Sequence, residues 1–254
     1  MNEGRFETGN TPDRPDSSKT AYFSRLAVKH LPQLKFLFTE GRLTRRDATG
    51  AKLSSDSREN WSNVVEHSLT EAAIIDTLSD LLGFDEDEKR RLTRTAVLHD
   101  WDKRLSKQPN LWTTEDVRRA TEELSKSGVD PILLASTSED FLEKCLIKGE
   151  ATFQEKLLAY ADAISEGSEI MPFKERYEQA ATRAHHYATD STWKQRLEPI
   201  LGTGANYWDG QIAMETRIQK EIFDALKLRG VSLESPDDLP RFVKSEIEKR
   251  YAHP

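Results

Sequence analysis

The sequence predicts an all-α fold. From about residue 21 onward the apolar residues recur at spacings of three and four, which is the period of an amphipathic helix. No run of alternating β-branched and polar residues indicates a half-buried strand. Helix-capping residues precede several of the periodic segments. A bundle of helices is therefore expected, and no internal repeat with a period of about 20–50 residues indicates a solenoid.

The helices of the first half have clear ends. The first core helix is predicted over residues 58–82 and stops at Gly83, a residue suited to a left-handed C-terminal cap. Asp85-x-x-Glu88 is a capping-box pattern that opens the next helix, which continues to His99. Thr113-x-x-Asp116 indicates another start. These signals place His99 at the end of an apolar helix.

The second half contains four further predicted helices. Thr152-x-x-Glu155 opens one that continues to about residue 164. Pro172 stands where a proline is favoured in the first turn, and it opens a helix to about residue 187. A long amphipathic helix follows over residues 207–228, and a last one follows Ser235-Pro236. We expect a helical domain over residues 20–190 and a C-terminal helical extension, residues 191–254, that packs on it.

Composition limits the classes of function. The chain has 254 residues with a formal net charge of −7, which argues against a broad surface for double-stranded nucleic acid. A small phosphorylated ligand in a local basic pocket remains compatible with this charge. The one cysteine, Cys145, cannot form an internal disulfide or a Cys-x-x-Cys zinc site, so a reducing compartment is expected.

The N-terminal segment is predicted to be a disordered leader. Residues 1–19 are rich in Gly, Asn, Asp, Pro and Ser, and Phe6 is their single large apolar residue. They contain no apolar region of a signal peptide, and no stretch of the chain approaches the roughly 18 apolar residues of a membrane span. A cytoplasmic protein without membrane association is expected.

Four side chains that can bind metal lie on the apolar faces of predicted helices. His67 lies in the apolar stripe of the first core helix, and His99-Asp100 ends the apolar run Thr95-Ala-Val-Leu-His-Asp. Asp162 is embedded in Leu157-Leu-Ala-Tyr-Ala-Asp-Ala-Ile, where a lone carboxylate would carry a large desolvation cost. One divalent cation bound by all four would remove this cost.

The order His67, His99-Asp100, Asp162 resembles the H…HD…D signature of the HD-domain superfamily of metal-dependent phosphohydrolases. The flanking sequences Val65-Glu66-His67 and Tyr160-Ala-Asp-Ala resemble those of the family, and the resemblance covers roughly residues 58–180. It implies that His67, His99, Asp100 and Asp162 bind a divalent metal ion. Two imidazoles and two carboxylates suit Mn, Fe, Co, Ni or Zn. Family members with two metals carry further histidines before the last aspartate, and residues 101–161 contain none, so one ion is expected.

The resemblance implies hydrolysis of a small phosphate ester, with a nucleotide as the expected substrate, by a phosphomonoesterase or phosphodiesterase mechanism. A metal-activated water would displace the leaving group. Asp100 would accept its proton, and Glu66 and Asp102 are further candidate catalytic residues. Lys103 stands where an HD-x-x-K subset has a lysine that faces the phosphate, so it is both a catalytic and a substrate-binding candidate. The other candidates for binding phosphate are Arg104, Lys174 and Arg176.

Two other interpretations stay open. The chain could be a non-catalytic regulatory module with an HD fold that binds a metal or a nucleotide, in which case it would hold metal tightly without hydrolysing any ester. It could also be an all-α scaffold without metal, whose melting temperature would not change on addition of Mn²⁺ or Ni²⁺. A homodimer is compatible with the long amphipathic helix over residues 207–228, although packing of that helix within the chain is preferred.

Overall fold

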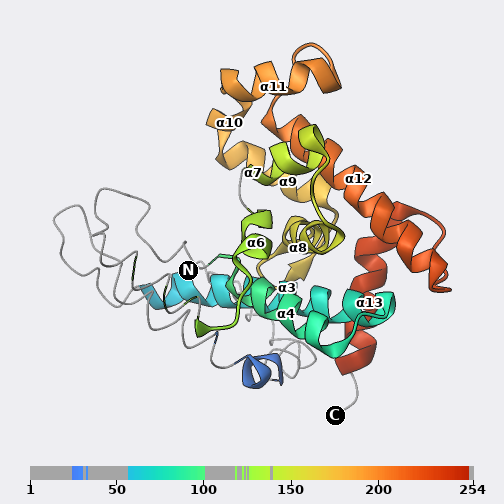
Figure 1. Cartoon of the computed structure of the whole chain (residues 1–254). Helices are drawn as coiled ribbons and strands as arrows, with labels where there is room; N and C mark the ends of the chain where they lie inside the picture. Colours follow the sequence, from blue (N-terminus) through green and yellow to red (C-terminus); the bar gives the residue numbers. More distant parts are fainter. Residues whose placement is uncertain are drawn as a thin grey trace, which may run out of the picture.

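The computed structural model describes residues 25–30, 33, 57–100, 118, 122, 124, 126–137 and 140–251. Within these residues the chain is almost entirely helical, with one two-stranded sheet (Figure 1). The expected all-α class is therefore confirmed. None of the helices in this part of the chain is both long and apolar enough to span a membrane.

The described elements are helices of different lengths and two short strands. In chain order they are α3 (Ser57–Leu82), α4 (Glu86–Leu98), α6 (Pro131–Leu134), the 3-10 helix η3 (Ala135–Thr137), α7 (Asp140–Leu142), the π-helix η4 (Glu143–Lys148), α8 (Phe153–Ala163), β1 (Ser165–Glu166), β2 (Glu169–Ile170), α9 (Phe173–Arg183), α10 (His185–Thr189), α11 (Ser191–Leu201), α12 (Tyr207–Leu228), the 3-10 helix η5 (Pro236–Asp238) and α13 (Leu239–Tyr251).

Local chemistry sets several helix ends as the sequence predicts. The Asp85 carboxylate accepts hydrogen bonds from two backbone N–H groups in the first turn of α4. Thr152 and Glu155 form a complete capping box at the start of α8. Gly83, which follows α3, has a φ of 72°, a conformation that costs glycine little because it has no Cβ. The predicted start at Thr113 lies outside the described residues.

The segment after Asp162 differs from the expectation. Ser165 pairs with Ile170 in a short antiparallel ladder, and strands of two residues are too short to show an alternating pattern. The expected helix from Pro172 to about residue 187 is divided in two. Ala184, with φ −126° and ψ 57°, leaves the helical region and separates α9 from α10. No glycine or proline marks this break.

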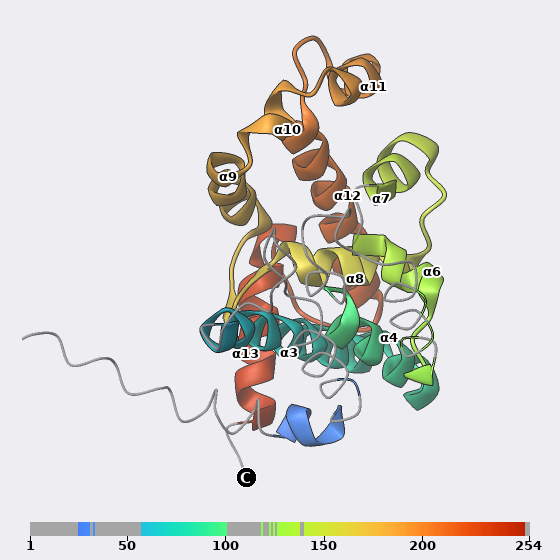
Figure 2. The same cartoon turned by 90° about the vertical axis from the view of Figure 1, so that its left-hand side faces the viewer.

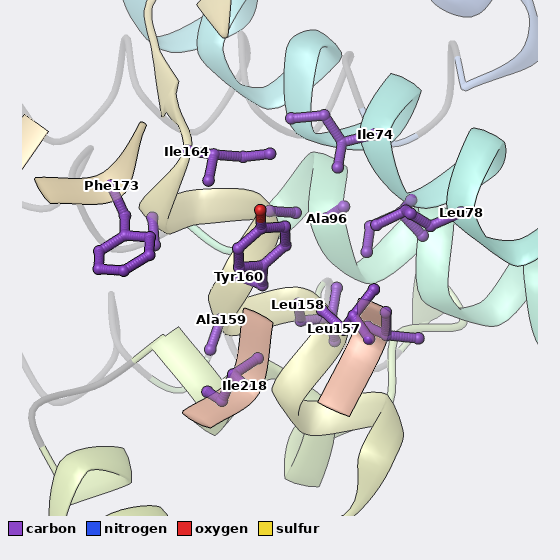
Figure 3. Packing of buried hydrophobic residues seen from close by; sticks show 14 of the residues in the cluster. Ile74, Leu78, Ala96, Leu157, Leu158, Ala159, Tyr160, Ile164, Phe173 and Ile218 are labelled. Atoms are coloured by element: carbon purple, nitrogen blue, oxygen red, sulfur yellow. The ribbon is translucent and has the colours of Figure 1, made fainter. Parts of the chain in front are cut away.

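Helix α8 occupies the centre of the core. Figure 3 shows its side chains between Ile74 and Leu78 of α3 on one side and Ile218 of α12 on the other. Tyr160 of α8 and all three of these residues are fully buried. Burying a large apolar side chain contributes about 1.5–3 kcal/mol. This central packing fixes the position of Asp162, which lies in the last turn of α8.

The C-terminal helices pack on the same core. In Figures 1 and 2, α12 crosses over α8, and α13 lies against α3. The Tyr160 hydroxyl donates a hydrogen bond of 2.9 Å to Gln219 Oε1, which joins α8 to α12. Arg250 of α13 donates to Asp80 of α3 at 2.6 Å. Helix α12 therefore forms part of the wall around the end of α8.

Candidate metal centre

Four side chains from three parts of the chain converge near the ends of α4 and α8. His67 and Glu71 come from α3, His99 follows the last residue of α4, and Asp162 lies on α8. One potential ligand atom of each lies within 4.8 Å of the other three. His67, Glu71 and His99 are buried, whereas 26% of the Asp162 side chain is exposed. The cluster could therefore hold a metal ion that is reached from the side of Asp162.

Glu71 is a member of the cluster that the sequence reasoning missed. It lies one helical turn after His67, so both side chains share a face of α3. Its Oε1 is 2.8 Å from His67 Nε2, and its Oε2 is 2.9 Å from His99 Nδ1. The signal was present in the sequence, because this carboxylate at position i+4 from His67 is followed directly by the apolar run Ala-Ala-Ile-Ile.

Several polar atoms of the cluster are buried without a hydrogen bond. They are His67 Nε2, His99 Nε2 and both carboxylate oxygens of Glu71. These atoms approach oppositely charged groups closely but do not point toward them with hydrogen-bond geometry. Unsatisfied buried polar atoms are costly and rare in folded proteins. Imidazole nitrogens and carboxylate oxygens directed into a shared space fit a first-row divalent cation.

Asp100 lies beside this cluster. Its Oδ1 is 3.1 Å from His99 Nε2, and its Oδ2 is 3.8 Å from His67 Nε2. Three of the four residues predicted as metal ligands, His67, His99 and Asp162, are thus members of the cluster, and the fourth, Asp100, lies beside it against the two histidines. The Asp100 side chain is 11% exposed, whereas that of Glu71 is completely buried.

Hydrogen bonds on the other ring nitrogens orient the two imidazoles. His67 Nδ1 is hydrogen-bonded to Ser165 Oγ at 3.1 Å. His99 Nδ1 lies 2.9 Å from the Ala96 carbonyl oxygen, to which it can donate. In the neutral tautomers that keep a proton on Nδ1, each Nε2 presents its lone pair to the cluster. Such support of the distal nitrogen is typical of histidine ligands.

The charges in the cluster are strongly coupled. Burial alone would lower the pKa of His67, but Glu71 and Asp162 outweigh it and raise this pKa. Burial also opposes charging of His99, yet Asp100 and Glu71 hold its pKa well above the ordinary value. A cation that binds here must displace protons from the imidazoles, so its affinity should fall as the pH falls.

Arg176 of α9 lies directly against the cluster. Its Nη2 is 2.8 Å from Asp162 Oδ1, and its Nε is 3.3 Å from Glu166 Oε2. Burial disfavours ionisation of Asp162, but Arg176 and His67 outweigh it and hold the pKa of this carboxyl well below its ordinary range. A guanidinium at this place can bind phosphate oxygens through N–H groups not used by the two carboxylates.

Of the other predicted site residues, Lys174 and Glu66 are described and neither belongs to the cluster. Lys174 is exposed on α9, with its Nζ 5.9 Å from the centre of the Phe173 ring. Glu66 is half-buried, and no hydrogen bond or ion pair of its side chain is found among the described residues. Asp102, Lys103 and Arg104 lie outside the described residues.

A cavity of about 220 Å³ begins at Asp162 and Arg176 and was also missed by sequence reasoning. Residues of α8, α9 and α12 form most of its wall, and Glu215 lies on this wall although only 1% of its surface is exposed. Burial holds the pKa of Glu215 well above the ordinary value, and the nearby Asp162 adds to this shift. The cluster therefore adjoins a pocket with a buried carboxyl group whose surroundings favour its uncharged form.

Comparison of the chain with protein-family models, with curated proteins and with solved structures gives no match in any of the three. The resemblance to the HD-domain superfamily consequently stays a prediction that depends on His67, His99, Asp100 and Asp162.

Proposed function

We propose that this protein is an HD-type, metal-dependent phosphohydrolase that acts on a small phosphate ester, with nucleotides as the preferred class. The observation that carries the proposal is the set of buried imidazole and carboxylate atoms without hydrogen bonds at His67, Glu71 and His99. A purely structural cluster would pair these atoms with donors or acceptors. Arg176 and the adjoining cavity supply the means to bind a phosphate and the group attached to it.

In this proposal His67, His99, Asp100 and Asp162 bind one divalent ion of the Mn, Fe, Co, Ni or Zn type. When bound, such an ion activates a water molecule and polarises a phosphoryl oxygen. Glu71 either adds a further oxygen ligand or holds the two imidazoles in place through its contacts at 2.8 Å and 2.9 Å.

Arg176 would hold the phosphate. A guanidinium carries five N–H donors; Nη2 of Arg176 contacts Asp162, and Nε contacts Glu166. No hydrogen bond or ion pair of Nη1 is found within the described part of the chain, so its donors are suited to a phosphate oxygen. The same residue would offset the negative charge that develops during hydrolysis.

Asp100 is the best-placed acceptor for the proton of the attacking water. Its side chain is partly exposed, whereas Glu71 is completely enclosed by protein. Solvent therefore reaches Asp100 more readily than Glu71. Glu71, in contrast, contacts both histidines and is suited to positioning them.

The test is release of phosphate from a panel of nucleotides and other phosphate esters, with and without Mn²⁺, together with the metal content of the protein. We expect metal-dependent release by the wild type and a large loss in Asp100→Asn. Asp76→Asn is the matched control, because Asp76 is another buried carboxylate on α3 that pairs with Lys29 and Lys89 outside the cluster. This control should keep its activity.

Two outcomes would contradict the proposal. Equal activity of Asp100→Asn and the wild type would exclude the proposed role of the cluster. Tight binding of metal without hydrolysis of any ester would favour the non-catalytic binding module instead.

A further inference from the structure

The cavity beside the metal centre has the size of a ring system. Its volume of about 220 Å³ is below the roughly 300–1,000 Å³ of pockets that enclose a whole drug-sized ligand. Its wall begins at Asp162 and Arg176 and continues between α9 and α12. A ligand with a phosphate at Arg176 could therefore insert only one compact group into the cavity.

Aromatic side chains form much of the wall. Tyr177 of α9 and Tyr207 and Trp208 of α12 all line the cavity. The ring centre of Trp208 is 6.0 Å from that of Tyr177 and 5.2 Å from that of Tyr207. These contacts hold the rings in place, and a flat ring in the cavity would pack against them. Stacking on aromatic side chains is a common way to bind nucleobases.

Glu215 gives the cavity a specific polar group. Its Oε2 is buried and has no hydrogen-bond partner among the described residues. The neighbouring Gln211 differs, because its Nε2 donates to the Tyr207 hydroxyl at 2.7 Å and its Oε1 lies 3.4 Å from the Tyr177 hydroxyl. A carboxyl oxygen enclosed without a partner is costly, and a ligand that hydrogen-bonds to the Glu215 carboxyl group would reduce that cost.

We propose that this cavity binds the base of a nucleotide, with the ring packed against Trp208 and Tyr177 and an N–H group of the base hydrogen-bonded to Glu215. The position of the phosphate at Arg176 and the metal centre rests on the proposed function, whereas binding of the base does not. The Arg176 guanidinium disfavours a quaternary ammonium group in the same small cavity, because the two positive charges would repel. A neutral aromatic base has no such conflict.

The first test uses nucleosides, which carry no phosphate, and protein without added metal. Calorimetry compares adenosine with purine riboside, which lacks the amino group, and uridine with 3-methyluridine, whose N–H donor is blocked. We expect at least one parent nucleoside to bind, roughly tenfold more tightly than its analogue, because one buried hydrogen bond is lost in the analogue. Equal binding within both pairs, no binding of either parent, or tighter binding of choline would overturn the proposal.

Variants separate the hydrogen bond from the stacking contact. Glu215→Met should abolish the preference for the parent nucleoside over its analogue. It should not lower the melting temperature, because it removes a buried acid with an unsatisfied oxygen. Trp208→Leu should weaken the binding of the parent nucleoside and of its analogue by a similar factor of about five or more, because stacking does not depend on the edge of the base. A preference that persists in Glu215→Met would contradict the role of Glu215.

Gln219→Met is the matched control on α12. Gln219 lies one turn after Glu215, is 3% exposed, and is bonded to Tyr160 and Asp237 rather than lining the cavity. This variant should lower the melting temperature but keep the preference within the nucleoside pair. Loss of the preference in Gln219→Met as well would show that the preference reports general damage to α12, and would overturn the assignment of Glu215.

This experiment fails independently of the phosphohydrolase proposal. Discrimination between nucleosides without hydrolysis of any ester would support the base pocket and contradict the enzyme. Hydrolysis of phosphate esters at rates that do not change in Glu215→Met for any nucleotide would support the enzyme and contradict the base pocket.

Discussion

Arg176 Nη2 on α9 lies 2.8 Å from Asp162 Oδ1 on α8, so one guanidinium connects the candidate metal centre to the wall of the adjoining cavity. The Arg176 side chain is 15% exposed and that of Asp162 is 26% exposed. Glu166 contacts the same guanidinium, because its Oε2 lies 3.3 Å from Arg176 Nε. Arg176 therefore neutralises two carboxylates at the place where we expect a phosphate to bind.

Removal of this guanidinium should destabilise the protein in a metal-dependent way. Arg176→Gln leaves Asp162 and Glu166 without their partner, and we expect a loss of about 1–3 kcal/mol in the free energy of unfolding, less than for a fully buried pair because water reaches both groups. Added Mn²⁺ should reduce this loss, since a cation bound at Asp162 neutralises part of the negative charge that Arg176 neutralises in the wild type. Urea unfolding with and without Mn²⁺ measures both effects.

Arg196→Gln provides the comparison, because Arg196 pairs with Glu143 at an exposed position. It should change the free energy of unfolding much less than Arg176→Gln does, and equally with and without Mn²⁺, because water screens an exposed pair. A loss in Arg176→Gln that Mn²⁺ does not alter would separate Arg176 from the metal centre.

Divalent metal should raise the melting temperature through Glu71 and the histidines. A ligand that binds only the native state stabilises it by about 2.7 kcal/mol at a concentration of 100 times Kd. Glu71→Gln removes one charge from the cluster, and we expect the shift caused by a fixed concentration of Mn²⁺ or Ni²⁺ to become smaller. Differential scanning fluorimetry measures the shift. An equal shift in Glu71→Gln and the wild type would show that Glu71 is not needed for metal binding.

Glu215 should make the protein less stable as the pH rises. Its folded pKa lies well above the ordinary value of 4.5, so between these two values the unfolded chain has lost a proton that the folded chain keeps. The free energy of unfolding then falls with increasing pH, by up to about 1.4 kcal/mol per pH unit for this group. Glu215→Met lacks this contribution, and its stability relative to the wild type should increase as the pH rises from 4.5 toward the folded pKa of Glu215. A constant difference over that range in urea unfolding would contradict the inferred burial of an unpaired acid.

Gly210 of α12 should resist replacement despite its position inside a helix. A Cβ added there would lie 2.8 Å from Leu197 Cδ1 and 3.1 Å from Leu142 Cδ2, and both leucines are fully buried. Alanine would gain roughly 1 kcal/mol in helix propensity, but overpacking of a filled core costs about 1–3 kcal/mol. We expect Gly210→Ala to lower the melting temperature. An increase would show that α11 and α7 can move away from α12 at little cost.

Much of the local structure could be predicted because its causes are local. Asp85 and the pair Thr152 and Glu155 bond to backbone groups within their own first turns, so the helix starts are visible in the sequence. The metal centre could be predicted in part for a similar reason. His67 and Asp162 are polar residues on apolar helix faces, which need a compensating partner wherever the helices pack.

The remaining features depend on contacts between distant segments. Glu71 was overlooked because the H…HD…D pattern contains no such residue, although its spacing from His67 placed both on one face. The cavity and Glu215 depend on how α12 is rotated against α8 and α9, and neither helix alone determines that rotation. The break at Ala184 also lacks a local signal, because neither glycine nor proline is present there.

Ser165 and His67 are 98 positions apart in the chain, yet their side chains hydrogen-bond at the candidate centre. The centre can be complete only after α8 and the turn that follows it have docked on α3, which requires closure of a long loop. Interactions that form after the rate-limiting step of folding mainly slow unfolding. A bound cation should accordingly act on the lifetime of the native state, by slowing its unfolding, and should leave the rate at which the chain folds nearly unchanged.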